Sequence, residues 1–207
     1  LFRDGRDVAV SFRKAVVGEK HPYHIANEWG ATQRIALTNR KNIDPKRFYN
    51  LSYETLTGSP EKAMRGLCEF LGVTYTDSML DFHESDEAKR AASSSELWGN
   101  VVKPVMADNS NKFLKEMSSE DIRIFELVAG DVLDALGYKR FQTKAGETKK
   151  FTADEIKQFD AENQRLKQEV LSKVDPEDMK RRDQQAALIK QIKERQQPVD
   201  SAVAAAK

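Results

Sequence analysis

The first eleven residues, from Leu1 to Ser11, restrict most strongly what this chain can fold into. Leu1 and Phe2 are apolar and predict the end of a buried strand, and a polar turn follows them. Asp7 is a good N-cap residue, so a helix is expected to start near it and to run to Gly18. A strand that passes through a short turn into a helix is typical of α/β folds.

The composition indicates a globular chain without a long-range electric field. Lys and Arg number 34 and Asp and Glu number 33 among 207 residues. This balance argues against nucleic acid or a membrane surface as a non-specific partner. The single cysteine, Cys68, cannot form an internal disulfide, and no stretch approaches the length of a membrane span. We therefore expect a cytoplasmic protein without a membrane span. The chain opens on Leu1 rather than Met, so we expect further sequence upstream.

Further elements follow along the chain. The segment 81–111 between two of the helices is polar and irregular, and a loop of that length is more often functional than idle. Ser59, Pro60 and Gly72 bound one helix, and Ser118 and Gly137 bound another. The expected elements are helices over 21–38, 60–71 and 118–136 and an aromatic-rich strand over 48–53.

After Tyr138 the chain becomes more charged and poorer in glycine. Thr152 and Glu155 form a capping box for a helix, and Asp175-Pro176 begins a second charged helix. The first of these helices carries a short heptad-like pattern, which predicts at most weak self-association through 152–195. The chain is therefore divided into a domain at 1–140, a charged helical extension at 141–197 and a disordered tail at 198–207. The pattern positions are Ile156, Phe159, Asn163, Leu166 and Val170.

Arg3 and Ser11 are the best candidates for binding an anion. A guanidinium beside the start of a helix can meet a phosphate through two hydrogen bonds, and a hydroxyl further along the helix can add another. On spacing alone, a surface Arg paired with Asp4 or Asp7 and an ordinary helical Ser11 is the more frequent explanation of the same residues.

The order of motifs over residues 1–140 resembles the sulfotransferase family. Arg3, Asp7 and Ser11 match its Arg-x-x-x-Asp-x-x-x-Ser pattern, and Tyr53-Glu54-Thr55-Leu56 is similar to its Tyr-Glu-Asp-Leu sequence, with Thr55 in place of the Asp. The helix after Ser59 and the segment from Lys103 to Tyr138 resemble the later part of the domain in bacterial members. Lys112 stands where many members have arginine, which keeps the charge but loses the fork geometry.

The resemblance implies a fold, a donor and a set of binding residues. The fold would be α/β, a P-loop NTPase-like three-layer arrangement with a parallel sheet, seen here without its first strands and so mostly helical. The donor would be 3′-phosphoadenosine 5′-phosphosulfate (PAPS), and the acceptor an unidentified hydroxyl or amine. Arg3 and Ser11 would hold the 3′-phosphate, Tyr53 would pack on adenine, and Lys112 would contact a phosphate.

The resemblance also implies what this segment lacks. The family's 5′-phosphosulfate loop and its general base lie upstream of the Arg3 motif, so no catalytic residue is assigned and these residues alone are expected to be inactive. His21, His24 and His83 lack metal-ligand spacing, so no metal is expected. Two alternatives stay open: another P-loop-type phosphotransferase, and a helical interaction protein that uses the charged tail.

Overall fold

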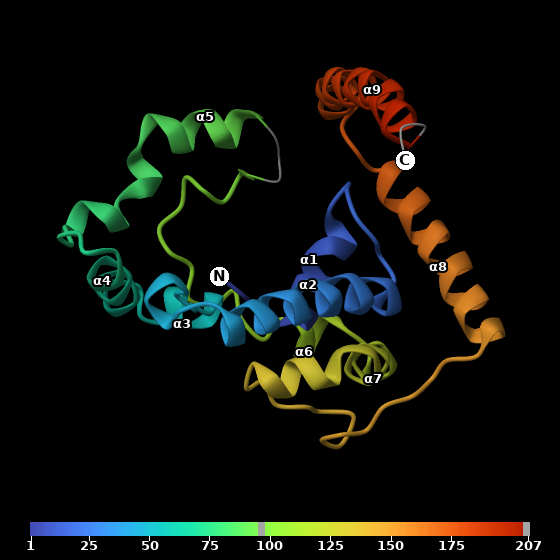
Figure 1. Cartoon of the computed structure of the whole chain (residues 1–207), viewed down its shortest axis with the longest axis horizontal. Helices are drawn as coiled ribbons and strands as arrows, with labels where there is room; N and C mark the ends of the chain where they lie inside the picture. The colour runs from blue at the N-terminus through green and yellow to red at the C-terminus, as the bar shows by residue number, and fades with distance from the viewer. Residues whose placement is uncertain (95–97, 205–207) are drawn as a thin grey trace. The chain divides into compact units, whose positions relative to one another are not determined.

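The computed structural model describes residues 1–94 and 98–204, without the side chains of 178, 181–182, 184–185 and 196–204. The chain divides into two compact units, residues Leu1–Leu171 and Ser172–Lys207. In chain order, the α-helices of the first unit are α1 (Gly5–Lys14), α2 (Pro22–Asn42), α3 (Tyr53–Gly58), α4 (Pro60–Leu71), α5 (Asp86–Ser94), α6 (Phe113–Glu116), α7 (Ser119–Ala135) and α8 (Ala153–Leu171) (Figure 1). The second unit contains α9 (Pro176–Ala204). Short 3₁₀ turns are η1 (Pro45–Arg47), η2 (Asp77–Leu80) and η3 (Phe82–Glu84).

The predicted three-layer α/β fold with a parallel sheet is wrong for the described residues, which contain no β-strand. The two predicted strands meet only in one isolated parallel bridge between Phe2 and Ser52. Two hydrogen bonds make it: the Phe2 amide donates to the Leu51 carbonyl at 3.0 Å, and the Tyr53 amide donates to the Phe2 carbonyl at 2.7 Å. The ladder ends there because α3 begins at Tyr53 and α1 begins at Gly5, so both backbones turn helical at once.

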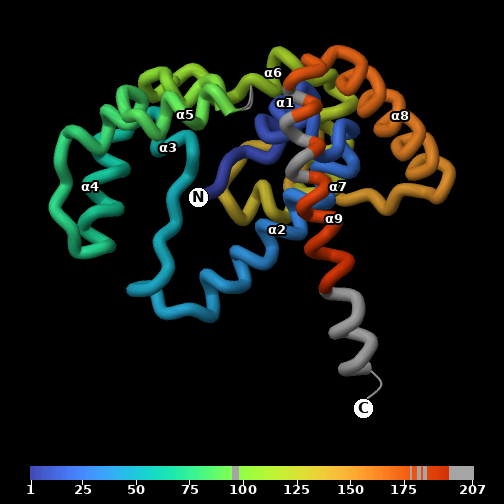
Figure 2. Tube along the Cα trace, turned by 90° about the horizontal axis from the view of Figure 1, so that it is seen from above, coloured from blue at the N-terminus to red at the C-terminus, as the bar shows by residue number. Residues whose placement is uncertain are grey.

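The core of the first unit is formed by α1, α2 and α7. Ala9, Ile25, Trp29, Phe125 and Leu133 are among its buried side chains. Gly5 is required where α1 meets the other two helices, because a Cβ at this position would lie 2.5 Å from ring atoms of both Trp29 and Phe125. The first turn of α1 therefore lies directly against the aromatic core, which fixes the position of the residues around it. Figure 2 shows α1, α2, α6 and α7 close together and α4 further away.

Several helix boundaries agree with the sequence analysis. Ser118 accepts a hydrogen bond from the Asp121 amide at the start of α7, and Thr152 exchanges hydrogen bonds with Glu155 at the start of α8. The segment 81–111 is less irregular than expected, because it contains η3 and α5. Of the predicted tail at 198–207, residues 205–207 lie outside the described part of the chain.

The first charged helix of the predicted extension, α8, belongs to the same compact unit as the core. Asn163 is buried, and its side-chain oxygen accepts hydrogen bonds from the amides of Lys20 and His21 at 2.8 and 3.0 Å. The ring of Phe159 stacks on His21 with 4.6 Å between centroids. Two of the predicted heptad positions therefore face the chain's own domain. Within the described residues, no helix is both long and apolar enough to cross a bilayer.

Candidate functional site

The start of α1 is held in place by two carboxylates. Asp4 caps the helix, with its side chain accepting a hydrogen bond from the Arg6 amide at 2.9 Å. The Asp4 amide in turn donates to Glu54 at 3.0 Å, and the other oxygen of Glu54 accepts from the Tyr138 hydroxyl at 2.9 Å. Burial and the adjacent Glu54 raise the pKa of Tyr138, so this hydroxyl keeps its proton. These bonds join α1 to the first turn of α3 and fix Arg3 just before α1.

Arg3 lies against Tyr53, the first residue of α3. Its guanidinium carbon is 4.4 Å from the centroid of the Tyr53 ring, which is a cation–π distance. One terminal nitrogen donates to the Asn109 carbonyl at 2.5 Å and lies 4.0 Å from the Asp7 carboxylate. The Arg3 Nε atom is buried and has no hydrogen-bond partner among the described residues. The guanidinium therefore retains donor capacity for a ligand beyond its protein contacts.

Asp7 ties the segment that contains Lys112 to α1. Its carboxylate accepts hydrogen bonds from the amides of Asn111 and Phe113 at 2.7 and 3.0 Å. Asn111 has φ of 60°, the left-handed conformation that asparagine tolerates better than most residues. The two amides flank Lys112, so Asp7 fixes the backbone on both sides of this lysine. Burial raises the pKa of Asp7, and the two amide donors oppose that rise.

The four predicted binding residues lie on neighbouring elements but do not all touch. Arg3 and Tyr53 are in contact. Lys112 is held next to α1 because the backbone amides of its two neighbours, Asn111 and Phe113, donate to Asp7. Ser11 lies one turn beyond Asp7 on the same face of α1, and its hydroxyl donates to the Asp7 carbonyl at 3.1 Å. Ser11 is exposed, so its hydroxyl is free to turn toward a ligand.

A cavity of about 390 Å³ opens beside Arg3 and its contacts. Tyr53 and Asn109, which both contact Arg3, also line this cavity. The Asn109 side-chain amide nitrogen donates to the Tyr53 hydroxyl at 2.8 Å. Lys103 lies among the lining residues, most of which are apolar. A mostly apolar cavity with a few polar groups at its edge is suited to a flat ring system. The apolar lining residues are Leu56, Pro60, Met64, Met79, Leu80, Phe82, Val101, Pro104, Val105 and Met106.

A buried ionic network, which the residue pattern did not indicate, lies beneath the site. Arg6 is 1% exposed and pairs with Asp4 at 2.7 Å and with Glu126 at 2.6 Å. Glu126 is fully buried and also accepts hydrogen bonds from the amides of residues 141–143. The guanidinium lies 4.2 Å from the centroid of the Phe113 ring. The sequence feature that could have revealed this network is Glu126, a glutamate at a core-facing position of α7 next to Phe125.

The histidines serve other purposes in the fold. His21 caps α2, and burial lowers its pKa to about 4, so this ring is neutral near pH 7. His24 lies 3.0 Å from Asp160 of α8, and His83 lies in η3. Across the described ranges 1–94 and 98–204, no three His, Cys, Asp or Glu side chains gather in a group suited to a metal ion.

Comparison with known proteins agrees with the sequence resemblance over the amino-terminal segment. The sequence model of the sulfotransferase family matches residues 1–77, which include Arg3, Asp7, Ser11 and Tyr53. A search of curated proteins found no match. The match confirms the resemblance over these residues, and the resemblance predicted for 78–140 stays a prediction.

Proposed function

We propose that this chain, whose residues 1–77 match the sulfotransferase family, binds PAPS as part of an enzyme that transfers its sulfuryl group to an acceptor hydroxyl or amine. The family match supports sulfotransfer as the activity. The choice of PAPS as the donor rests on one observation: Arg3, just before α1, contacts Tyr53, which lines the 390 Å³ cavity. This arrangement places a phosphate-binding cation next to an aromatic ring and an apolar cavity.

The 3′-phosphate would be held by Arg3 and Ser11. The guanidinium can donate from its free nitrogens while it keeps its bond to the Asn109 carbonyl, and the Ser11 hydroxyl can exchange its bond to the Asp7 carbonyl for one to phosphate. Lys112 would add charge from the segment that Asp7 fixes. The negative charge of Asp7 is directed at two backbone amides, so it is partly offset where the phosphate would lie.

The adenine would enter the cavity beside Tyr53. One face of this ring is covered by Arg3, and Tyr53 also lines the cavity. A purine is a flat, largely apolar ring with a few polar edges, and stacking on an aromatic side chain contributes about 1–3 kcal/mol per base. Asn109 and Lys103 lie at the cavity lining and can meet the polar edge.

The reaction would be in-line attack of the acceptor oxygen or nitrogen on the sulfur atom. The bond between acceptor and sulfur forms, the bond from sulfur to the bridging phosphate oxygen breaks, and the acceptor proton passes to a general base. None of the residues 1–207 is assigned as that base. The role proposed for this segment is to bind and orient the nucleotide half of the donor, which lowers the entropy cost of the transfer.

The test is to compare nucleotides that differ in one phosphate. Adenosine 3′,5′-bisphosphate should bind more tightly than 5′-AMP and ATP in isothermal titration calorimetry of the purified chain. Arg3→Ala should remove the preference over 5′-AMP, because the extra phosphate has lost its bidentate partner. Arg90→Ala, which removes an exposed arginine of α5, is the matched control.

Two results would count against the proposal. Preference for ATP would favour a phosphotransferase, the alternative weighed from the sequence. Equal affinity for adenosine 3′,5′-bisphosphate and 5′-AMP would show that Arg3 and Ser11 do not hold a 3′-phosphate.

A further inference from the structure

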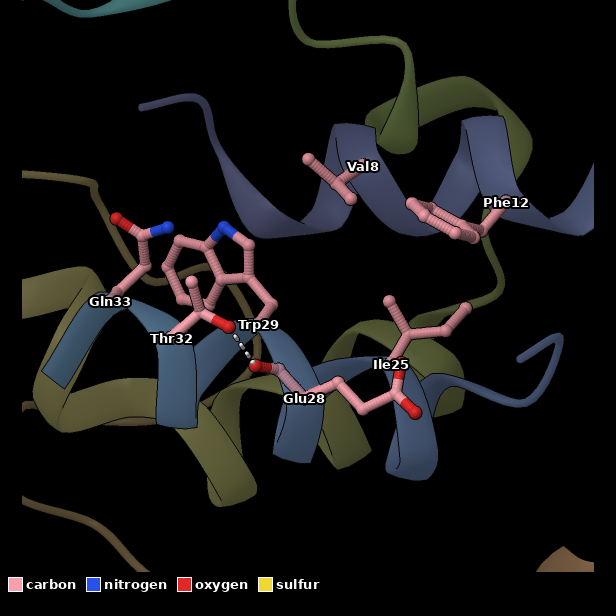
Figure 3. Close-up of a pocket in the computed structure, with 7 residues that line it drawn as sticks. All are labelled: Val8, Phe12, Ile25, Glu28, Trp29, Thr32 and Gln33. Atoms are coloured by element: carbon pink, nitrogen blue, oxygen red, sulfur yellow. Dashed lines mark hydrogen bonds between the residues drawn. The ribbon is translucent and has the colours of Figure 1, made fainter. Parts of the chain in front are cut away.

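A second cavity, of about 220 Å³, lies in a groove between α1 and α2. Figure 3 shows Val8 and Phe12 of α1 facing Ile25 and Trp29 of α2 across this groove. Ile25 and Trp29 are 4% and 8% exposed, so they are rigid parts of the core that present one side to the groove. The groove is thus a fixed apolar surface with two aromatic rings in its walls.

One charge borders this surface. Glu28 is the only charged side chain among the seven lining residues, and Thr32 and Gln33 supply the remaining polar groups. The Thr32 hydroxyl donates to the Glu28 carbonyl of the backbone at 3.0 Å, which leaves the carboxylate itself uninvolved. Glu28 is exposed and has no ion-pair partner among the described residues. The groove therefore combines aromatic walls with an uncompensated negative charge.

We propose that this groove binds a small organic ammonium ion, with its apolar or aromatic body between Phe12 and Trp29 and its cationic group at Glu28. A cation is attracted both by a carboxylate and by the faces of aromatic rings, whereas an anion is repelled by both. The volume is below the roughly 300 Å³ at which pockets for drug-sized ligands begin. A primary amine that carries a single ring or a short alkyl chain fits these limits.

The groove is separate from the nucleotide site. Asp7 and Ser11 are four residues apart and share one face of α1, and Arg3 lies just before the helix, whereas Val8 and Phe12 lie on the next face. The seven lining residues do not include any that line the 390 Å³ cavity. Binding of an amine here does not require the chain to bind PAPS or to transfer a sulfuryl group.

Trp29 provides a direct readout. The chain has two tryptophans, and Trp98 is 54% exposed, so Trp98→Phe leaves Trp29 as the single reporter in the groove. The full chain with this change would be titrated with 2-phenylethylammonium, and with neutral 2-phenylethanol and anionic phenylacetate as matched probes. We expect saturable quenching by the ammonium, roughly fivefold weaker binding of the alcohol, and no saturation with phenylacetate.

The charge is tested by Glu28→Gln in the same background. This exposed substitution keeps the shape of the side chain and should weaken the ammonium roughly fivefold while leaving the alcohol unchanged. Glu69→Gln, an exposed glutamate of α4 outside both cavities, should change neither titration. The proposal is overturned if the ammonium does not saturate the Trp29 signal, or if it binds as tightly to the Glu28→Gln variant as to the parent.

Discussion

The guanidinium of Arg3 lies 4.4 Å from the ring centroid of Tyr53, although fifty residues separate them in the sequence. The parallel bridge between Phe2 and Ser52 places the two side by side, since each follows directly after a bridged residue. Asn109 then contacts both, accepting from Arg3 through its carbonyl and donating to the Tyr53 hydroxyl through its amide nitrogen. A charged group, an aromatic face and a loop therefore meet at one point, from three distant parts of the chain.

The Tyr53 ring and its hydroxyl have separable roles. Tyr53→Phe removes only the 2.8 Å bond from Asn109, so affinity for adenosine 3′,5′-bisphosphate should fall about threefold. Tyr53→Ala removes the ring from Arg3 and from the cavity, so affinity should fall about tenfold or more. Isothermal titration calorimetry measures both. Wild-type affinity in Tyr53→Ala would exclude a role for the ring in nucleotide binding.

Asp7 should determine the order of the segment around Lys112. In Asp7→Asn, the amide group can accept from one backbone N–H but not from both without turning its own NH₂ group toward a donor. We expect the free energy of unfolding to fall by about 1–3 kcal/mol. The amides of Asn111 and Phe113 should lose protection in hydrogen exchange, because Asp7 is their acceptor.

Asp108→Asn is the control for this change, since Asp108 is exposed and lies on the same segment. It should leave both amides protected. If the Asp7→Asn variant kept the wild-type protection of Asn111 and Phe113, Asp7 would not be what holds this segment.

The sequence could predict several helix boundaries because they depend on neighbouring residues, although Asp4 rather than Asp7 caps α1, which ends at Lys14 rather than at Gly18. Ser118 with Asp121, and Thr152 with Glu155, made the expected cap contacts within one helical turn. Pro60 and Gly72 likewise bound α4, with Gly72 left-handed at φ of 69°. Of the candidate site, the sequence pattern selected Arg3 and Tyr53, which the structure brings into contact.

The sequence could not predict features that depend on distant partners. A strand needs neighbours along its whole length, and the segments at Phe2 and Ser52 each offer one bridged residue before the chain becomes helical. One of the two carboxylate partners of Arg6 is 120 residues away, at Glu126. Asn163 fitted a heptad pattern, but its acceptor oxygen is used by the amides of Lys20 and His21 in the same chain.

The buried pair of Arg6 and Glu126 should matter far more for stability than a similar pair at the surface. Glu126→Ala leaves the Arg6 charge buried with one partner fewer and frees three backbone amides, so we expect a loss of about 3–5 kcal/mol. Asp131→Ala breaks the exposed pair with Arg34, whose length of 2.7 Å is close to the 2.6 Å of the buried pair, and should cost under about 1 kcal/mol. Urea unfolding at pH 7 compares the two variants. Similar losses for both would contradict the ranking by burial.

His21 should make the fold less stable as the pH falls below neutral. Its ring is 6% exposed and stacks on Phe159, and burial lowers its pKa from 6.5 to about 4. The nearby Asp121 and Glu162 favour the charged ring, while Arg13 and His24 oppose it. Between pH 6.5 and about 4, the unfolded chain binds a proton at His21 that the folded chain does not. The free energy of unfolding therefore decreases over this window as the pH falls, by at most about 3 kcal/mol from this group.

His21→Asn isolates that contribution. Asparagine still caps α2 toward the Tyr23 amide but does not titrate, so the curve of unfolding free energy against pH should be flatter between 6.5 and 4 than in the wild type. Urea unfolding at half-unit pH steps gives the two curves. Because Phe159 and Asn163 bring α8 against this histidine, a flattened curve would also show that α8 remains packed on the domain in solution. An unchanged slope in His21→Asn would mean that the ring is exposed to water and that α8 does not cover it.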